Sequence, residues 1–166
     1  MLEPFLEQTA KHFAEQVPAI DGWSLRLVSE RKETLAVRQD ILQPSDTLVN
    51  RGAFVSVVHA GASGYAATSD LSASGLRAAL ERAREWAELT ARWSLLDAEV
   101  LPRCARSGSY ETPVREPWGK LSNEDKIGQL QKASRSMKID ERIVDWWAWL
   151  VYRQIDTLLI SGDGAR

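Results

Sequence analysis

The stretch Gly52–Ser72, which reads GAFVSVVHAGASGYAATSDLS, decides the expected fold. It opens with an apolar β-type run at Phe54–His59, and a second β-type run follows at Tyr65–Thr68. The residues between the two runs include Gly61 and Gly64, and glycines in such an interval are typical of a turn. The stretch therefore predicts a β-hairpin with its turn over residues 61–64.

A long amphipathic helix is expected directly after this hairpin. The segment Ser69–Ser72 supplies side-chain oxygens that can accept the unpaired N–H groups of a first helical turn. Mostly apolar residues then recur every three or four positions, which is the spacing of one helical face. These residues are Leu76, Ala79, Leu80, Ala83, Trp86, Ala87, Thr90 and Trp93. Because small alanines stand beside large tryptophans, we expect the whole face to pack closely on a sheet.

Upstream of the hairpin, the sequence predicts a helix and two further strands. Apolar residues at three- and four-residue spacing predict the helix over residues 2–17. Alternating patterns predict strands at 23–28 and 35–39, and the short interval 30–33 would join them as a hairpin. Residues 43–51 are polar and are expected to form a loop. The expected order is therefore a helix followed by four antiparallel strands.

Downstream of the long helix, the sequence first loses its periodicity. Residues 95–121 contain three prolines and are expected to form a linker or a wrapping segment. A capping pattern at Ser122–Asp125 then opens a helix that continues to Met137. Residues 143–152 are apolar on both faces and predict a strand that is covered on both sides. A turn at 153–156 would lead into a last short strand.

These elements predict an α+β fold, with an antiparallel sheet of hairpins packed against one long helix and further helices. The helices would form a single layer on the sheet. The expected domain order is an N-terminal domain at 1–94, an irregular linker at 95–121, and a helix plus β-hairpin at 122–166 that starts a following region. Because the sequence stops just after the turn Ser161–Gly164, we expect the chain to be cut from a longer protein.

The composition disfavours several classes of partner. The net charge is −2 and the pI is about 5.8, so the chain lacks the basic surface with which proteins bind nucleic acid. No segment has the run of about 20 apolar residues that spans a membrane. The N-terminus lacks the pattern of a signal peptide, and Cys104 is the only cysteine. We therefore expect a cytoplasmic protein without nucleic-acid or membrane partners.

The residue types that perform catalysis are few and scattered. A catalytic zinc needs three converging protein ligands, and the only histidines, His12 and His59, lack the required spacing. Cys104 lies in the irregular linker and is interpreted as an incidental loop cysteine. The glycines at 61–64 lack the lysine and the strand–loop–helix order of a phosphate loop. The sequence thus predicts no catalytic, metal-binding or cofactor-binding residues within this chain.

Three tryptophans near the C-terminus form a candidate partner interface. Alternation along a strand would put Trp147 and Trp149 on one face and Trp146 on the other. Burial in the core is the simpler interpretation, because aromatic residues dominate burial energetics. The functional interpretation is an interface, in which tryptophan often serves as an anchor.

The order of these segments and their residue patterns resemble the N-terminal region of the TldD/PmbA family. Members of this family were once called modulators of DNA gyrase and are now regarded as metallopeptidases. Three segments carry the resemblance: the hairpin and capped helix start at Gly52–Ser72, the alanine-studded helix at Ala79–Ala87, and the turn at Ile160–Gly164. The residues of this family-like structural motif are Gly52, Gly61, Gly64, Tyr65, Asp70, Ser72, Gly162 and Gly164.

The resemblance implies what the parent protein does. Family members pair as homo- or heterodimers, and one partner carries a zinc-binding His-Glu-x-x-x-His helix downstream of the region matched here. That partner cleaves peptides or unfolded protein segments in an enclosed cavity, and its zinc-less paralogue supports it. Because this chain lacks the His-Glu-x-x-x-His motif, any zinc would belong to the full-length parent or its partner.

Two functions follow as hypotheses. The first is a non-catalytic N-terminal domain of a TldD/PmbA-type metallopeptidase system, which shapes the substrate passage and supports dimer assembly for peptide proteolysis. The second is a stand-alone binding or scaffold protein that recruits a protein partner through its sheet edge or its tryptophan-rich strand. The two differ in whether the reading frame continues to a His-Glu-x-x-x-His segment.

Overall fold

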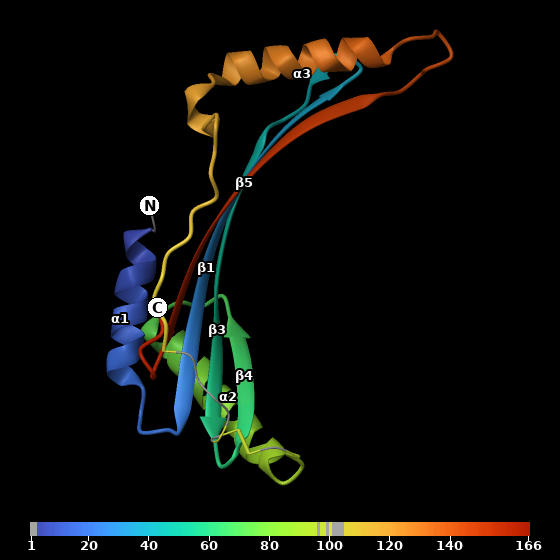
Figure 1. Cartoon of the computed structure of the whole chain (residues 1–166). Helices are drawn as coiled ribbons and strands as arrows, with labels where there is room; N and C mark the ends of the chain where they lie inside the picture. Colours follow the sequence, from blue (N-terminus) through green and yellow to red (C-terminus); the bar gives the residue numbers. More distant parts are fainter. Residues whose placement is uncertain (1–2, 96, 99, 101–104) are drawn as a thin grey trace. The chain divides into compact units, whose positions relative to one another are not determined.

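Five strands form one sheet in the part of the chain that this computed structural model describes, residues 3–95, 97–98, 100 and 105–166. Figure 1 shows the strands and the helices. The elements in chain order are α1 (Pro4–Gln16), β1 (Gly22–Arg38), β2 (Ile41–Leu42), β3 (Asp46–His59), β4 (Ala62–Thr68), α2 (Ala73–Ala91), the 3-10 helix η1 (Trp118–Lys120), α3 (Asn123–Met137) and β5 (Trp147–Ser161). The strand order is β2-β1-β3-β4, and β5 also pairs with β1. The predicted α+β class is confirmed.

The chain divides into two units, and each unit draws on separated parts of the sequence. The first unit comprises Met1–Ser29, Asn50–Ser109 and Ile155–Arg166. The second unit comprises Glu30–Val49 and Tyr110–Gln154. Within the described ranges, no helix combines the length and the apolar composition that crossing a membrane requires.

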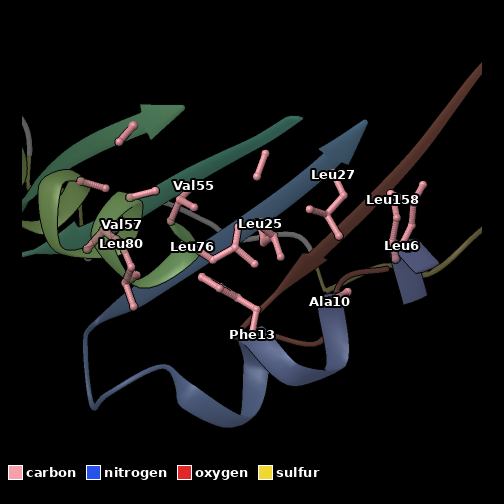
Figure 2. Packing of buried hydrophobic residues seen from close by; sticks show 14 residues of the cluster. Leu6, Ala10, Phe13, Leu25, Leu27, Val55, Val57, Leu76, Leu80 and Leu158 are labelled. Atoms are coloured by element: carbon pink, nitrogen blue, oxygen red, sulfur yellow. The ribbon is translucent and has the colours of Figure 1, made fainter. Parts of the chain in front are cut away.

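In the first unit, helices α1 and α2 pack on one face of the sheet. Odd-numbered residues of β1 and β3 in this unit point to this face, and Leu25, Leu27, Val55 and Val57 are fully buried there, as expected from the two-residue period of a strand. Figure 2 shows these side chains meeting Phe13 of α1 and Leu76 of α2. Burying one such side chain stabilises the fold by about 1.5–3 kcal/mol, so this cluster is the main core of the unit.

The long helix α2 begins as predicted, because the Ser72 side chain accepts a hydrogen bond from the Gly75 N–H at 3.1 Å. Its buried face consists of Leu76, Ala79, Leu80, Ala83 and Ala87. The expectation that both tryptophans share this face is wrong, since Trp86 is 52% exposed and Trp93 is 75% exposed. At Gly64 of β4 the helix backbone lies so close to the strand that an added Cβ would overlap it.

The hairpin of β3 and β4 is confirmed, but its turn lies earlier than expected. His59 pairs with Ala62, so only Ala60 and Gly61 connect the strands. Their φ values of 54° and 75° are those of the two-residue turn that matches the twist of a hairpin. Gly64, which was expected in the turn, is the third residue of β4 and pairs with Val57.

The hairpin predicted between strands at 23–28 and 35–39 is wrong, because β1 is continuous from Gly22 to Arg38. The interval 30–33 contains no glycine, proline, asparagine or aspartate, so nothing in it favours a turn. Its charged side chains form ion pairs instead: Arg31 with Glu33 at 2.7 Å, and Glu30 with Arg153 at 2.8 Å. The actual turn is at Gln39 and Asp40, where φ is positive at both residues.

The loop expected over residues 43–51 is also wrong in its second half, because β3 begins at Asp46. Residues 46–51 of β3 are all exposed, so no buried face imposes an alternating apolar pattern on them. The prediction was wrong because it treated a polar stretch as a loop, whereas an exposed strand can also be polar.

In the second unit, α3 packs on β1 and β5 around Val37, Leu130 and Ala148. The helix starts as predicted, because the Ser122 side chain accepts from the Asp125 N–H at 3.0 Å. The buried Ser134 of α3 donates to the Asp40 carboxylate at 2.7 Å. Its hydroxyl also accepts from the Trp146 indole at 3.1 Å, which joins the helix to the residue that precedes β5.

The C-terminal strands predicted at 143–152 and 157–160 are one strand, β5, which runs from Trp147 to Ser161 without a turn at 153–156. The predicted coverage on both sides is wrong as well, since Trp147 and Trp149 are 43% and 66% exposed. Helix α3 covers only the face that carries Ala148. A polar interval such as Arg153–Asp156 is compatible with a strand wherever one face is open to solvent.

Candidate functional site

The eight residues of the family-like motif all lie in the first unit. Most of them allow a turn, a close backbone contact or a helix cap. A side chain at Gly64 would overlap the backbone of α2 at Ala83 and Ala87. A side chain at Gly162 would meet the indole of Trp23 at 2.7 Å. Gly61 and Gly164 adopt positive φ values of 75° and 86°, which glycine tolerates best.

Of the remaining motif residues, Gly52 and Tyr65 lie within β3 and β4, and Asp70 and Ser72 lie just before α2. Gly52 precedes the paired part of β3, and Ser72 caps α2. The Ser72 backbone N–H donates to the Asp70 carboxylate at 3.0 Å. Hydrogen bonds from Ser72 lower the pKa of Asp70, because they stabilise its ionised form. Tyr65 differs from the others, since its side chain is 66% exposed on β4.

The outer edge of β4 is the first candidate site. Figure 1 shows β4 as the last strand of the row beyond β3, and no described strand pairs with its other edge. The carbonyl of Ser63 points away from β3 and accepts from the Thr90 hydroxyl at 3.4 Å. Because hydrogen-bonding directions alternate along a strand, Tyr65 and Ala67 present their N–H and C=O groups on that same edge.

The second candidate site is the sheet face opposite the helices of the first unit. It carries the even-numbered residues of β1 and β3 together with Tyr65 of β4. The Arg26 guanidinium lies 5.5 Å from the ring centre of Phe54. The rings of Phe54 and Tyr65 stack with centres 5.3 Å apart and planes 24° apart. Three neighbouring strands therefore place one cation and two aromatic rings in a row.

A hollow of about 360 Å³ opens beside this row. Its lining residues are Arg26, Val28, Gly52, Ala53, Phe54, Ala67, Thr68 and Ser69. Among the described residues, no carboxylate pairs with the Arg26 guanidinium. The hollow thus combines apolar walls with one cation, a combination that is typical of ligand sites.

The histidines do not form a metal site. His59 Nδ1 faces Asp21 Oδ2 at 3.1 Å, and its Nε2 faces Glu88 Oε1 at 3.5 Å. These carboxylates lie on opposite sides of the ring and do not converge on one point. His12 is exposed on α1. The described residues hold no group of three potential ligands and so do not fit a zinc ion, whereas Cys104 lies outside the described residues.

The three tryptophans of the predicted interface lie in the second unit. Trp147 and Trp149 share one face of β5 with Val151, which is 44% exposed. The guanidinium of Arg38 covers the Trp147 ring at 5.0 Å and forms two hydrogen bonds of 2.9 Å with Asp145. Trp146 is half-buried and, as noted, donates to Ser134.

Sequence reasoning missed Arg26 and Phe54 as candidate site residues. The available signal was alternation: if Leu25 and Val55 face the core, then Arg26 and Phe54 face the other side. What the pattern did not provide was the pairing of β1 with β3, which brings these two side chains together.

Solved structures with a similar fold come from longer proteins. A candidate modulator of DNA gyrase from Bacteroides thetaiotaomicron aligns with a TM-score of 0.64 and 16% identity, over 97% of this chain and 40% of that chain. A candidate modulator of a DNA gyrase from Thermotoga maritima aligns with a TM-score of 0.59 and 19% identity, over 96% of this chain and 36% of that chain. TldE from Thermococcus kodakarensis aligns with a TM-score of 0.57 and 13% identity, over 93% and 34% of the two chains.

These likenesses show the fold, and this chain spans only 34% to 40% of the length of those proteins. No curated protein sequence matched the chain. Residues 23–87, however, match the sequence model of PmbA/TldA metallopeptidase domain 1. That match includes the hairpin and most of α2, which are two of the three segments that carried the resemblance, whereas the third, Ile160–Gly164, lies outside it. The resemblance to the TldD/PmbA family is therefore confirmed over residues 23–87, which match the family's first domain.

Proposed function

We propose that this chain is a non-catalytic N-terminal domain that shapes the substrate passage of a TldD/PmbA-type peptidase and supports its dimer assembly. The free outer edge of β4 is the observation that carries the proposal. An extended peptide can add to such an edge as another strand. Zinc and the catalytic residues then belong to the parent protein or its partner.

An edge of this kind suits the handling of unfolded segments. Main-chain hydrogen bonds supply affinity whatever the peptide sequence, because every residue except proline carries the same donor and acceptor. The side chains along β4 are mostly small, so they leave room for a neighbouring strand. The exposed Tyr65 adds an aromatic contact on one face.

Dimer assembly is assigned to the face of β5 that carries Trp147, Trp149 and Val151. Large exposed aromatic residues are unusual on a surface that stays in water, and tryptophan is enriched at the centres of interfaces. The three side chains share one face of a strand and can enter an interface together.

The edge is tested by proline substitution. We expect Ala67→Pro to remove one outward N–H and leave the pairing with β3 intact, because proline is tolerated on the open side of an edge strand. The matched control is Ala67→Val, which retains the N–H. A capped neutral peptide is titrated into the isotope-labelled chain, and amide shifts of β4 are followed by NMR. We expect the peptide to shift the β4 amide signals of the native chain and of the valine variant, but not those of the proline variant. Shifts of equal size in the proline variant would contradict the edge site.

The dimer surface is tested by sedimentation. We expect Trp149→Ser to shift the chain toward monomer, whereas Trp93→Ser, which changes an even more exposed tryptophan in the first unit, leaves the association unchanged. If both variants associate like the native chain, the β5 face is not the dimer interface.

The absence of catalysis is tested directly. The purified chain is incubated with zinc and a flexible reporter peptide, and cleavage is followed by mass spectrometry. We expect no products. Cleavage that is removed by a chelator would contradict the non-catalytic assignment.

A further inference from the structure

The hollow beside Arg26 is lined by small residues of β3 and β4 that stand beside larger ones. Gly52 and Ala67 contribute little side-chain volume on this face, whereas Phe54 and Val28 stand beside them. A Cβ added at Gly52 would meet only the Thr68 carbonyl oxygen, at 3.5 Å, which is an ordinary contact. Packing therefore does not require glycine there, and the space is open to a ligand.

Arg26 lines this hollow, and its guanidinium lies over the Phe54 ring. Its position over Phe54 is supported by the stacking of Phe54 on Tyr65. Stacking engages the face of a guanidinium and leaves its in-plane N–H groups available. In the described residues no acidic side chain takes up these donors. The charge is thus oriented by two aromatic rings but is not neutralised.

We propose that this hollow binds the acidic side chain of an extended peptide, with its carboxylate paired to Arg26 and its methylene groups against Phe54. The inference rests on the proposed function, since it specifies which peptides the domain retains. The planar fork of arginine matches a carboxylate with two parallel hydrogen bonds. The apolar wall suits the short aliphatic part of glutamate.

A peptide C-terminus is the other possible source of a carboxylate, but the hollow suits it less well. Capture of a chain terminus typically uses a nest of backbone N–H groups. Here the lining residues come mostly from β1, β3 and β4, and Arg26 supplies the one cation among them. One side-chain cation on an otherwise apolar surface fits an acidic side chain better.

The test uses the whole chain and three peptides. Two are capped at both ends and contain a central glutamate or a central glutamine, and the third contains neither residue but has a free C-terminus. Binding is followed by NMR shifts of Arg26, Phe54 and Ala67. We expect the glutamate peptide to bind at least about tenfold more tightly than the glutamine peptide, since a hydrogen bond to a charged group contributes this much. Equal binding of these two peptides, or tighter binding of the free C-terminus, overturns the proposal.

Variants locate the site. Arg26→Gln is expected to remove the preference for glutamate, and Arg26→Lys to retain part of it, because lysine keeps the charge but loses the planar fork. The matched control is Arg82→Gln, which removes an exposed cation of α2. A glutamate preference that survives Arg26→Gln overturns the proposal.

A small probe separates this proposal from the proposed function. N-acetylglutamate methylamide carries the acidic side chain without an extended peptide. Arg26-dependent binding of the probe supports the hollow even when extended peptides fail to bind, in which case the proposed function fails alone. Edge binding of the neutral peptide without any glutamate preference leaves the proposed function standing and overturns the acidic-side-chain site.

Discussion

Gly64 of β4 lies directly against the Ala83 carbonyl of α2, so closely that no side chain fits between the strand and the helix. On the helix side the contact is continued by Ala87, which is fully buried. Glycine on the strand and alanines on the helix thus form one close packing contact. The contact is consistent with alanine at positions 83 and 87 of this helix.

We expect Gly64→Ala to destabilise the first unit strongly. The new methyl group would overlap helix backbone, which cannot move aside as a flexible side chain can, and overpacking typically costs about 1–3 kcal/mol. Thermal and urea unfolding measure the effect. The matched control is Gly128→Ala in α3, where no atom lies within 4 Å of the added carbon and alanine is expected to stabilise the helix by about 1 kcal/mol. Similar stabilities of the two variants would contradict the close contact.

The start of α2 provides a second prediction. Ser72→Ala removes the acceptor for the Gly75 N–H, and loss of an N-cap costs about 1 kcal/mol in the free energy of unfolding. Urea denaturation measures this difference. Ser69→Ala, three residues earlier and outside the cap, is the control and is expected to change stability by less than about 0.5 kcal/mol. A Ser72 variant as stable as the Ser69 variant would show that the cap contributes nothing.

The elements that were predicted correctly are those whose signals are local. The cap at Ser72, the cap at Ser122 and the glycine-containing hairpin depend on residues within a few positions of one another. Their chemistry is readable from the sequence because the partner groups are neighbours in the chain. The same holds for the alanine face of α2, whose period is visible in the sequence.

The elements that were missed depend on partners far away in the sequence. Nothing near residues 30–33 reveals that Glu30 pairs with Arg153, or that β5 continues through residues 153–156. Burial of the tryptophans was wrong for a similar reason, since exposure depends on which faces the helices leave open. The row of Arg26, Phe54 and Tyr65 likewise requires three strands to be placed side by side.

The Glu33 carboxylate of the second unit gives a prediction about acid sensitivity. The Trp118 indole donates to it at 2.6 Å, and this hydrogen bond is the main reason why the pKa of Glu33 lies below its ordinary value. The ion pair with Arg31 acts in the same direction. Because the pKa of Glu33 is lower in the folded than in the unfolded state, its ionised carboxylate stabilises the fold at pH values above the unfolded-state pKa. This stabilisation is lost as the pH falls through the folded-state pKa.

We therefore expect Trp118→Phe to raise the pKa of Glu33 and to destabilise the chain at neutral pH, with the difference from the native chain vanishing in acid. Phenylalanine retains an aromatic ring to stack on Tyr152, whose ring centre lies 5.0 Å away, so the variant chiefly removes the N–H donor. NMR titration of the Glu33 carboxyl and urea unfolding across the acid range measure the two effects. Trp149→Phe is the control; an unchanged Glu33 pKa in Trp118→Phe would contradict the assignment.

The hydroxyl of Ser134 is the buried polar connection of the second unit. It accepts from the Trp146 indole at 3.1 Å and donates to the Asp40 carboxylate at 2.7 Å. Asp40 belongs to the turn between β1 and β2, where its φ of 65° is unfavourable for most residues. The one hydroxyl thereby links a helix, a strained turn and the segment that leads into β5.

We expect Ser134→Ala to lower the free energy of unfolding by about 1–3 kcal/mol, because it leaves an indole N–H and a carboxylate without their partner. The matched control is Ser136→Ala, two residues further along α3, whose exposed hydroxyl donates only to the Ala133 carbonyl at 2.7 Å. Urea unfolding compares the variants, and the NMR shift of the Trp146 indole proton reports the lost hydrogen bond. If Ser134→Ala matches the control in stability while the indole proton shifts, the hydrogen bond exists but does not stabilise the unit. If neither changes, the hydroxyl does not connect these elements in solution.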